Sequence, residues 1–410
     1  MEHLYRRTNM ERLNTVIQAI IERKAKQQGP LCAYVYDLDN LRVHTASLSA
    51  SLPPSVRLFY AVKANADERI LKTVAPYVTG FEVASGGELQ KVRRLFADSP
   101  VIFGGPGKTD EELAAAIEER VALIHVESVW ELQRLNWIAA RRQTTVRVLL
   151  RVNLRQAASG ATLHMAGKPT QFGIDEQHIA EAIHTALTLP SIDLQGFHFH
   201  SMSNHTDEQA HLSFIETCLS FVAQAETTYG RRFSVVNVGG GVGVHYNEPD
   251  RQFRWNWFSK ELNLLLRRQA PPHWTVIFEL GRFIAAHNGY YAAEVLDLKT
   301  NYGTHFAIIR GGTHHLRLPA AWKMNHPFLV IPIDEWPYPF NRPSLHNQRV
   351  TLAGELCTPN DILARDVPCA RLRVGDIVLF RCAGAYGWDI SHHDFLSHPH
   401  PEFIYLESSM

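Results

Sequence analysis

The sequence predicts a TIM-type barrel of eight β-strands and α-helices, followed by a second domain that is rich in β-strands. Three observations support this prediction. Apolar strand-like runs alternate with helical stretches over residues 56–282. The first of these strands ends in Lys63, and in such barrels catalytic residues lie at the C-terminal strand ends. After Arg282 the helical pattern fades, and strand-like runs are separated by Gly, Pro and Asn.

The elements follow in chain order. A helix is expected over residues 10–28 and a short strand over 32–36. The barrel strands are expected at 56–63, 80–85, 101–104, 122–126, 145–152, 194–200, 234–239 and 275–280. Later strands are expected at 290–299, 305–310, 348–352 and 376–382. Residues 325–347 contain five prolines and are expected to form a long irregular insertion, a lid or an interface.

This pattern places the barrel domain at residues 38–282 and a β-rich domain at residues 1–37 and 283–410. The chain has 41 basic and 41 acidic residues, so no net charge attracts it to nucleic acid or to an anionic membrane. No window approaches the ~18 apolar residues of a membrane span, and we expect a cytoplasmic protein. Five cysteines without a CxxC pair argue against disulfides or structural zinc.

Lys63 ends a strand of apolar and aromatic residues, Leu58 to Val62. Burial favours the neutral form of a lysine, which could then form a Schiff base with a carbonyl compound. A lysine at a strand end more often reaches out to water. The rest of the chain must therefore decide between these two interpretations.

Two motifs follow the seventh and eighth strands, where barrels of this type favour phosphate sites. Gly239 to Gly241 could let backbone N–H groups approach a phosphate, with a tight turn as the alternative. Glu279 could hold a proton on a pyridine nitrogen, and Gly281 and Arg282 could complete the phosphate site. The alternative for Glu279 and Arg282 is a surface salt bridge.

His198 and His200 alternate on the sixth strand and therefore face the same side. They could bind a metal, but no acidic or cysteine ligand accompanies them at suitable spacing. An imidazole stacked on an aromatic cofactor is at least as plausible.

The second domain offers a thiol, Cys357, four residues before a carboxylate, Asp361. A buried structural cysteine is the usual alternative. Tyr386 lies among small residues, and its hydroxyl could bind a phosphate or simply pack at a turn.

Together these motifs resemble the pyridoxal-phosphate-dependent amino-acid decarboxylases of the alanine-racemase fold, the group of ornithine and diaminopimelate decarboxylases. The resemblance runs nearly from end to end and implies a homodimer with shared active sites. For the cofactor, pyridoxal 5′-phosphate, it implies the ligands Lys63, His200, Ser203, Gly239, Gly240, Gly241, Glu279, Gly281, Arg282 and Tyr386. For catalysis it implies Lys63, His200, Glu279 and a cysteine given across the dimer interface, Cys357, without a metal.

Three positions depart from the family pattern. Met202 replaces a glycine, Leu280 replaces a proline, and Thr358 replaces the acid that normally follows the cysteine. A neutral hydroxyl at position 358 cannot compensate the desolvation of a substrate ammonium group. Free lysine, ornithine and diaminopimelate are therefore expected to be poor substrates.

Within the family, residues 163–173, 311–319 and 383–396 resemble the siderophore decarboxylases of the staphyloferrin B type. This resemblance implies citryl-diaminopropionate, a citryl-linked L-amino acid, as substrate. O-citryl-L-serine, as in achromobactin or vibrioferrin pathways, a free diamino acid, and a cofactor-free regulatory homologue are the alternatives. The substrate is expected to contact Arg155, His315, Arg317, Thr358 and Asp361.

Overall fold

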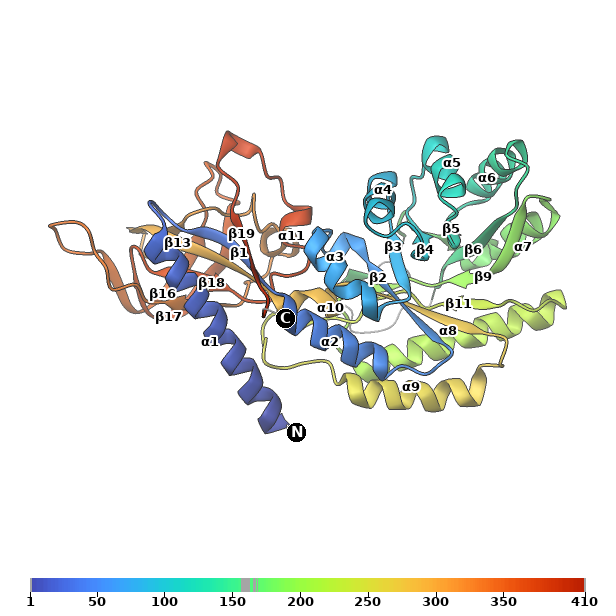
Figure 1. Ribbon diagram of the computed structural model, residues 1–410, viewed down its shortest axis with the longest axis horizontal. Helices are drawn as coiled ribbons and strands as arrows, with labels where there is room; N and C mark the ends of the chain where they lie inside the picture. Colours follow the sequence, from blue (N-terminus) through green and yellow to red (C-terminus); the bar gives the residue numbers. More distant parts are fainter. Residues whose placement is uncertain (1, 156–162, 165–166, 168, 409–410) are drawn as a thin grey trace. The chain divides into compact units, whose positions relative to one another are not determined.

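The computed structural model describes residues 2–155, 163–164, 167 and 169–408 (Figure 1). Residues 165, 166 and 168 of the siderophore-type stretch 163–173 lie outside this set. The chain forms two compact units. One contains Arg42–Val244 and Gln252–Ile284, and the other contains Met1–Leu41, His245–Arg251 and Ala285–Met410.

The first unit contains a closed parallel barrel. Its eight strands in the described part of the chain are β2 (Val56–Ala61), β3 (Gly80–Val83), β4 (Val101–Phe103), β5 (Leu123–Val126), β6 (Val146–Asn153), β9 (Ile192–His198), β11 (Val235–Asn237) and β12 (Thr275–Leu280). Each pairs with its neighbour, β12 pairs with β2, and β5 pairs with β6, which closes the ring. All eight strands lie where the sequence predicts them, within a few residues, which confirms the predicted fold class.

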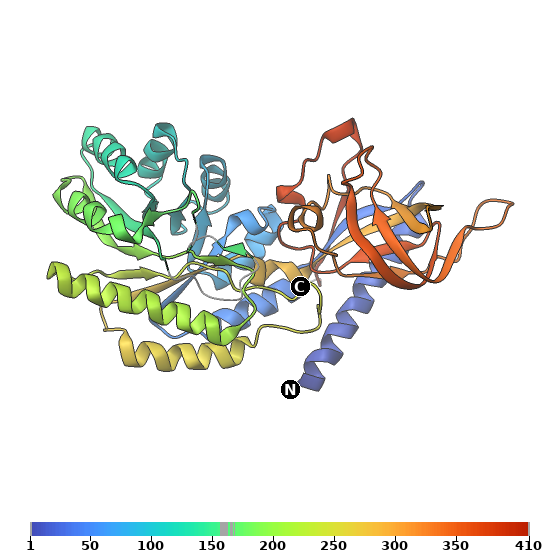
Figure 2. The ribbon, with the colours of Figure 1, turned by 180° about the vertical axis from the view of Figure 1, so that it is seen from behind.

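Helices surround the barrel strands on the outside (Figures 1 and 2). They are α2 (Leu38–Ala50), α3 (Glu68–Val74), α4 (Gly86–Leu95), α5 (Asp110–Glu118), α6 (Val129–Arg141), α7 (Ile179–Thr188), α8 (Glu208–Tyr229), α9 (Trp255–Gln269) and α10 (Arg282–Ala285). Five of them begin at a residue whose side chain accepts from the first-turn backbone, namely Asp67, Ser85, Thr109, Ser128 and Asp207. These caps fix the loops at the C-terminal strand ends.

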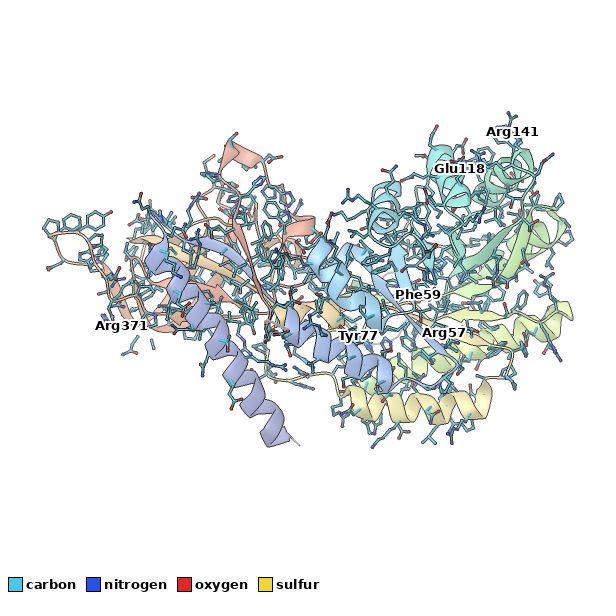
Figure 3. All side chains as sticks on the ribbon, viewed as in Figure 1. Arg57, Phe59, Tyr77, Glu118, Arg141 and Arg371 are labelled. Atoms are coloured by element: carbon cyan, nitrogen blue, oxygen red, sulfur yellow. The ribbon has the colours of Figure 1, made fainter. Side chains whose placement is uncertain are left out.

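An apolar layer fills the barrel. It consists of residues from six strands, Phe59, Ile102, Leu123, Leu149, Val235 and Ile277, and Phe59 is labelled in Figure 3. Side chains two residues apart on a strand point the same way, so the residues two positions later also face the barrel interior, nearer the C-terminal ends. This second layer is polar.

The second unit is a mostly antiparallel sheet. In the described residues its strands are β1 (Cys32–Asp37), β13 (Gly289–Asn301), β14 (Thr304–Ile309), β15 (Phe328–Ile331), β16 (Ser344–Ala353), β17 (Ile362–Arg373), β18 (Ile377–Phe380) and β19 (Glu402–Leu406). Helix α1 (Glu2–Lys26) packs Val16 and Ile20 into the sheet's core. The short helix α11 is Leu318–Trp322.

The sequence patterns missed β15, β17 and β19. Residues 325–347 are not irregular throughout, because they contain β15 and the beginning of β16. Prolines 327 and 332 bracket β15 closely, and β17 carries exposed charged residues and Pro368, so neither shows the period of a half-buried strand.

The smaller strands are β7 (Leu163–His164), β8 (Ile174–Asp175) and β10 (Met202–Ser203). None of the described helices is long and apolar enough to cross a membrane.

Candidate active site

The polar layer of the barrel is the candidate site. His125, Arg151, Asn237 and Glu279 each follow a residue of the apolar layer by two positions, on β5, β6, β11 and β12. Glu82 on β3 and His198 on β9 join the layer, and all six residues are buried. Groups that would be costly to bury without partners are therefore gathered at one end of the barrel.

Lys63 lies on the 3₁₀ turn Val62–Ala64 directly after β2, and its ammonium forms an ion pair with the buried carboxylate of Glu82. Burial raises the pKa of Glu82 to about 7, although Lys63 opposes this shift, and Glu279 adds to it. The sequence analysis assigned no role to Glu82. A glutamate between the apolar residues Phe81 and Val83 of a predicted strand was the available signal.

Glu279 is the central carboxylate of the layer. Asn237 Nδ2 donates to its Oε1 at 2.7 Å, while His125 Nδ1 lies 3.6 Å from Oε1 and His198 Nε2 lies 3.4 Å from Oε2. Burial alone raises the pKa of Glu279, but His125, Lys63 and His200 and the Asn237 hydrogen bond outweigh it, and the net shift is downward. Glu279 is therefore an anion at neutral pH.

The glycine loop follows β11 directly. The backbone N–H of Gly239 donates to Asn237 Oδ1 at 2.9 Å, which ties the loop to the amide that holds Glu279. A Cβ on Gly239, where φ is +69°, would lie 2.6 Å from the Phe199 carbonyl oxygen, and one on Gly240 would lie 2.1 Å from that of Glu279. Only glycine fits this close approach of backbones.

His200 lies just beyond β9, and its Nδ1 accepts a hydrogen bond from the Gly240 N–H at 3.3 Å. Burial, with Arg151 and Lys63 nearby, lowers the pKa of His200 well below its usual value. The residue therefore offers a neutral, flat ring. This arrangement suits stacking on an aromatic cofactor better than binding an anion.

The donor atoms of His125, His198 and Glu279 lie within 4.8 Å of one another, so these residues could in principle hold a metal ion. However, the two imidazole rings are stacked, with centroids 3.9 Å apart and planes at 24°. Imidazole lone pairs lie in the ring plane, so nearly parallel rings cannot both point at one ion. A metal would require one ring to turn.

Ser203 is half-buried on β10, and Arg282 is buried at the start of α10, after Gly281. A Cβ on Gly281 would lie 2.6 Å from the Ala64 Cβ, which explains the glycine there. These three predicted phosphate ligands thus belong to the same unit as Lys63. Tyr386 lies in the β-rich unit, half-buried, with a left-handed backbone at φ +54°.

The other predicted residues of the β-rich unit have different surroundings. Cys357 is exposed and Thr358 is half-buried on the same turn. Asp361 is 1% exposed and accepts from Thr313 N, Thr313 Oγ1 and Leu356 N at 2.6–2.8 Å. These hydrogen bonds shape the turn that carries Cys357, and a contact of Asp361 with the substrate stays a prediction.

His315 is buried, and its Nδ1 lies 3.1 Å from Tyr291 Oη. Burial, with His314 and Arg310 nearby, lowers the pKa of His315 to about 2, so it cannot offer a positive charge to a substrate carboxylate. Arg317 is exposed, and its guanidinium makes no ion pair within the described residues.

Arg155 presents both Nε and Nη2 to Asp175, at 3.0 and 2.9 Å. The guanidinium of Arg155 is thus already paired with a carboxylate. The expectation that Arg155 binds a substrate carboxylate gains no support from this geometry. The acidic partner lies 20 residues away on β8, too far along the chain for a local pattern to indicate the pair.

Comparison with known proteins gives relatives over nearly the whole chain. The chain is 48% identical over 393 residues to 2-[(L-alanin-3-ylcarbamoyl)methyl]-2-hydroxybutanedioate decarboxylase of Staphylococcus aureus, covering 95% of this chain and 98% of the relative. It is 30% identical to L-glutamyl-[BtrI acyl-carrier protein] decarboxylase of Niallia circulans, covering 90% and 87%. It is 32% identical to diaminopimelate decarboxylase of Vibrio cholerae, covering 90% and 85%.

Solved structures support the fold. Diaminopimelate decarboxylase from Helicobacter pylori, complexed with L-lysine, aligns with a TM-score of 0.82 at 24% identity, covering 94% of this chain and 93% of that one. The Paramecium bursaria Chlorella virus arginine decarboxylase bound to agmatine gives 0.79 at 24%, covering 96% and 100%.

Residues 38–286 match the model of the pyridoxal-dependent decarboxylases, pyridoxal binding domain. The barrel fits this cofactor, because it supplies a strand-end amine, a buried carboxylate and a neutral flat imidazole. It also supplies a glycine loop in which an added Cβ would collide with neighbouring backbone. These observations confirm the family that the sequence motifs indicated, together with its cofactor and its chemistry. The chain belongs to the pyridoxal-phosphate-dependent amino-acid decarboxylases.

Proposed function

We propose that the enzyme decarboxylates citryl-L-2,3-diaminopropionate in the biosynthesis of a carboxylate siderophore. The observation that carries this proposal is the 48% identity to the Staphylococcus aureus enzyme over 98% of that enzyme's length, against 32% to the Vibrio cholerae diaminopimelate decarboxylase. The name of the Staphylococcus aureus enzyme describes a substrate whose distal part is a hydroxybutanedioate, with two carboxylates. The distal group is thus anionic.

The loop that carries Cys357 suits an anionic distal group. Its two acids are engaged within their own unit, Glu355 by Arg310 and Asp361 by Thr313. Thr358 is neutral, and Arg317 has no anionic partner among the described residues. A substrate ammonium group would find no unused carboxylate here to compensate its desolvation, whereas a carboxylate would find a guanidinium.

Bound pyridoxal phosphate supplies an electron sink for the bond that breaks when CO2 leaves. Within the chain, Lys63 would hold the cofactor, and Glu279 would keep a proton on its ring nitrogen. His200 would pack on the ring face. Gly239 to Gly241, Gly281, Arg282, Ser203 and Tyr386 would bind the phosphate.

Cys357 is proposed to return a proton from Sγ to the substrate carbon, and its exposure is what makes the thiol accessible. We also propose that the enzyme is a homodimer in which Cys357 serves the partner's cofactor. A cytoplasmic location, where thiols stay reduced, agrees with this role.

The test of the substrate is CO2 release, measured side by side for citryl-diaminopropionate, O-citryl-L-serine, diaminopimelate, ornithine and lysine. The amide-linked citryl conjugate should give the highest kcat/KM, because its distal carboxylates match the loop. Higher kcat/KM with any free diamino acid than with both citryl conjugates would refute the siderophore assignment. A preference for the ester would move the assignment to O-citryl-L-serine.

Variants of Arg317 and Arg155 test which of the two arginines binds the distal group of the substrate. Arg317→Ala should raise KM for the citryl conjugate roughly 10- to 100-fold with little change in kcat, because a charge-assisted hydrogen bond made in the ground state is lost. Arg155→Ala should change KM less than about threefold, since Asp175 already occupies that guanidinium. The reverse order of effects would show that Arg155, not Arg317, binds the distal group.

Lys63 is expected to be the residue joined to the cofactor. After borohydride reduction of the loaded enzyme, peptide mass spectrometry should find the pyridoxyl label on Lys63, and Lys63→Ala should lose the visible absorbance band. Lys260→Ala is the control, because Lys260 is exposed on α9. A label on another lysine would overturn the assignment, and no band in cofactor-supplied wild type would favour a regulatory homologue.

The shared active site is tested by mixing two inactive variants, Lys63→Ala and Cys357→Ala, under conditions of subunit exchange. Heterodimers that assemble one intact site should recover up to about a quarter of wild-type activity at random pairing of equal amounts. Each variant alone provides the baseline. No recovery, although exchange is demonstrated by native mass spectrometry, would mean that each chain uses its own Cys357.

A further inference from the structure

His125 is the buried residue of the polar layer that the proposed chemistry leaves without a role. It lies on β5, it is 0% exposed, and its ring stacks on that of His198. Its Nδ1 has no hydrogen-bond partner in the part of the chain that the structure describes, and neither do Nδ1 and Nε2 of His198. Unsatisfied polar atoms at this depth cost stability, so an apolar pair would fold more easily.

The hydrogen bonds around Asn237 fix the state of His125. The Gly239 N–H donates to Asn237 Oδ1, so the oxygen faces the glycine loop and Nδ2 faces the other way. Nδ2 then donates one hydrogen to Glu279 Oε1 at 2.7 Å and has its second directed at His125 Nε2 at 3.1 Å. Since Nε2 must accept, a neutral His125 carries its proton on Nδ1, which faces Glu279 Oε1 at 3.6 Å.

We propose that His125 is a positioning residue that, by accepting from Asn237, holds Glu279 as the carboxylate that keeps the cofactor ring nitrogen protonated. The inference rests on the proposed contact between Glu279 and that nitrogen. Without the imidazole acceptor, the Asn237 amide would lose one of its three hydrogen bonds and could turn. Glu279 would then lose a donor that stabilises its charge.

The charged surroundings of Glu279 are compatible with this role. The titratable groups that face it come from the strands and turns around it, and they are Lys63, Glu82, His125, His198 and His200. Burial lowers the pKa of both His125 and His198 well below the usual value, and Arg151 and Lys108 lower them further. The imidazoles therefore stay neutral, and His125 acts on Glu279 through the Asn237 hydrogen bond and through the Nδ1–H that faces Oε1 at 3.6 Å rather than as a cation.

The test follows the cofactor nitrogen directly. The full-length enzyme is loaded with pyridoxal phosphate labelled with 15N in the ring, and the nitrogen chemical shift is recorded against pH by NMR. In the wild type the nitrogen should stay protonated to high pH. His125→Phe keeps a ring for stacking but removes the acceptor, and it should lower the midpoint of deprotonation by about one pH unit or more.

Two further variants separate positioning from packing. His125→Gln retains an amide oxygen as acceptor and should return the midpoint toward the wild-type value. His211→Phe is the control, since His211 is a buried histidine of α8 that contacts Phe253 and Phe258 away from the site. It should leave the midpoint unchanged, whatever its effect on stability.

A midpoint in His125→Phe equal to that of the wild type would overturn the proposal. If His125→Phe does not fold, His125→Ala carries the same test, and a midpoint equal to the wild type again overturns it. Glu279→Gln tests the contact between Glu279 and the ring nitrogen separately from the role of His125. If this variant leaves the nitrogen titration of the wild type unchanged, the contact between Glu279 and the nitrogen is wrong, whereas a shift in Glu279→Gln without one in His125→Phe refutes only the role of His125.

Discussion

The hydrogen bond between Asn237 and Glu279 is the interaction on which the site depends. A carboxylate buried in the barrel pays a desolvation penalty of several kcal/mol, and a hydrogen bond to a charged group returns only about 1.5–3 kcal/mol. The remainder must come from other groups, and Lys63 is the cation nearby. Asn237 also accepts from Gly239, so the same side chain positions the carboxylate and the glycine loop. Glu279 and the glycine loop are therefore coupled through one amide.

The alternation of side chains on the barrel strands explains why this arrangement is possible. Leu123, Leu149, Val235 and Ile277 close the barrel with an apolar layer, and the residues two positions later form the polar layer above it. The apolar layer excludes water from below, which strengthens the electrostatic interactions of the layer above. The helix caps at Asp67, Ser85, Thr109 and Ser128 fix the loops at the same end. Fold and chemistry thus depend on the same period of two residues.

That period also defines how much could be predicted from the sequence. The eight strands could be predicted from the alternation of apolar runs and helical stretches. Lys63, the glycine loop and Glu279 could also be found, because each lies at a strand end and has an informative residue type. Asn237 and His125 lie two residues beyond an apolar-layer residue, but that layer is known only once the strands are in register. Glu82 has no such marker, because Gly80 stands two positions before it. The partners of Asp361 and Arg155 could not be predicted, since they depend on contacts between turns and short strands. Of the charged residues expected to contact the substrate, Arg155 and Asp361 have partners in the structure, whereas Arg317 makes no ion pair within the described residues.

The central claim is that Glu279 meets the ring nitrogen of pyridoxal phosphate while Lys63 holds the other side of the ring. A crystal structure of the cofactor-loaded enzyme tests it most directly. The account predicts a Glu279 carboxylate oxygen about 2.7–2.9 Å from the ring nitrogen, with Asn237 still donating to the same carboxylate. A ring nitrogen that faces a different residue, or a Glu279 that has turned away to another partner, would contradict it.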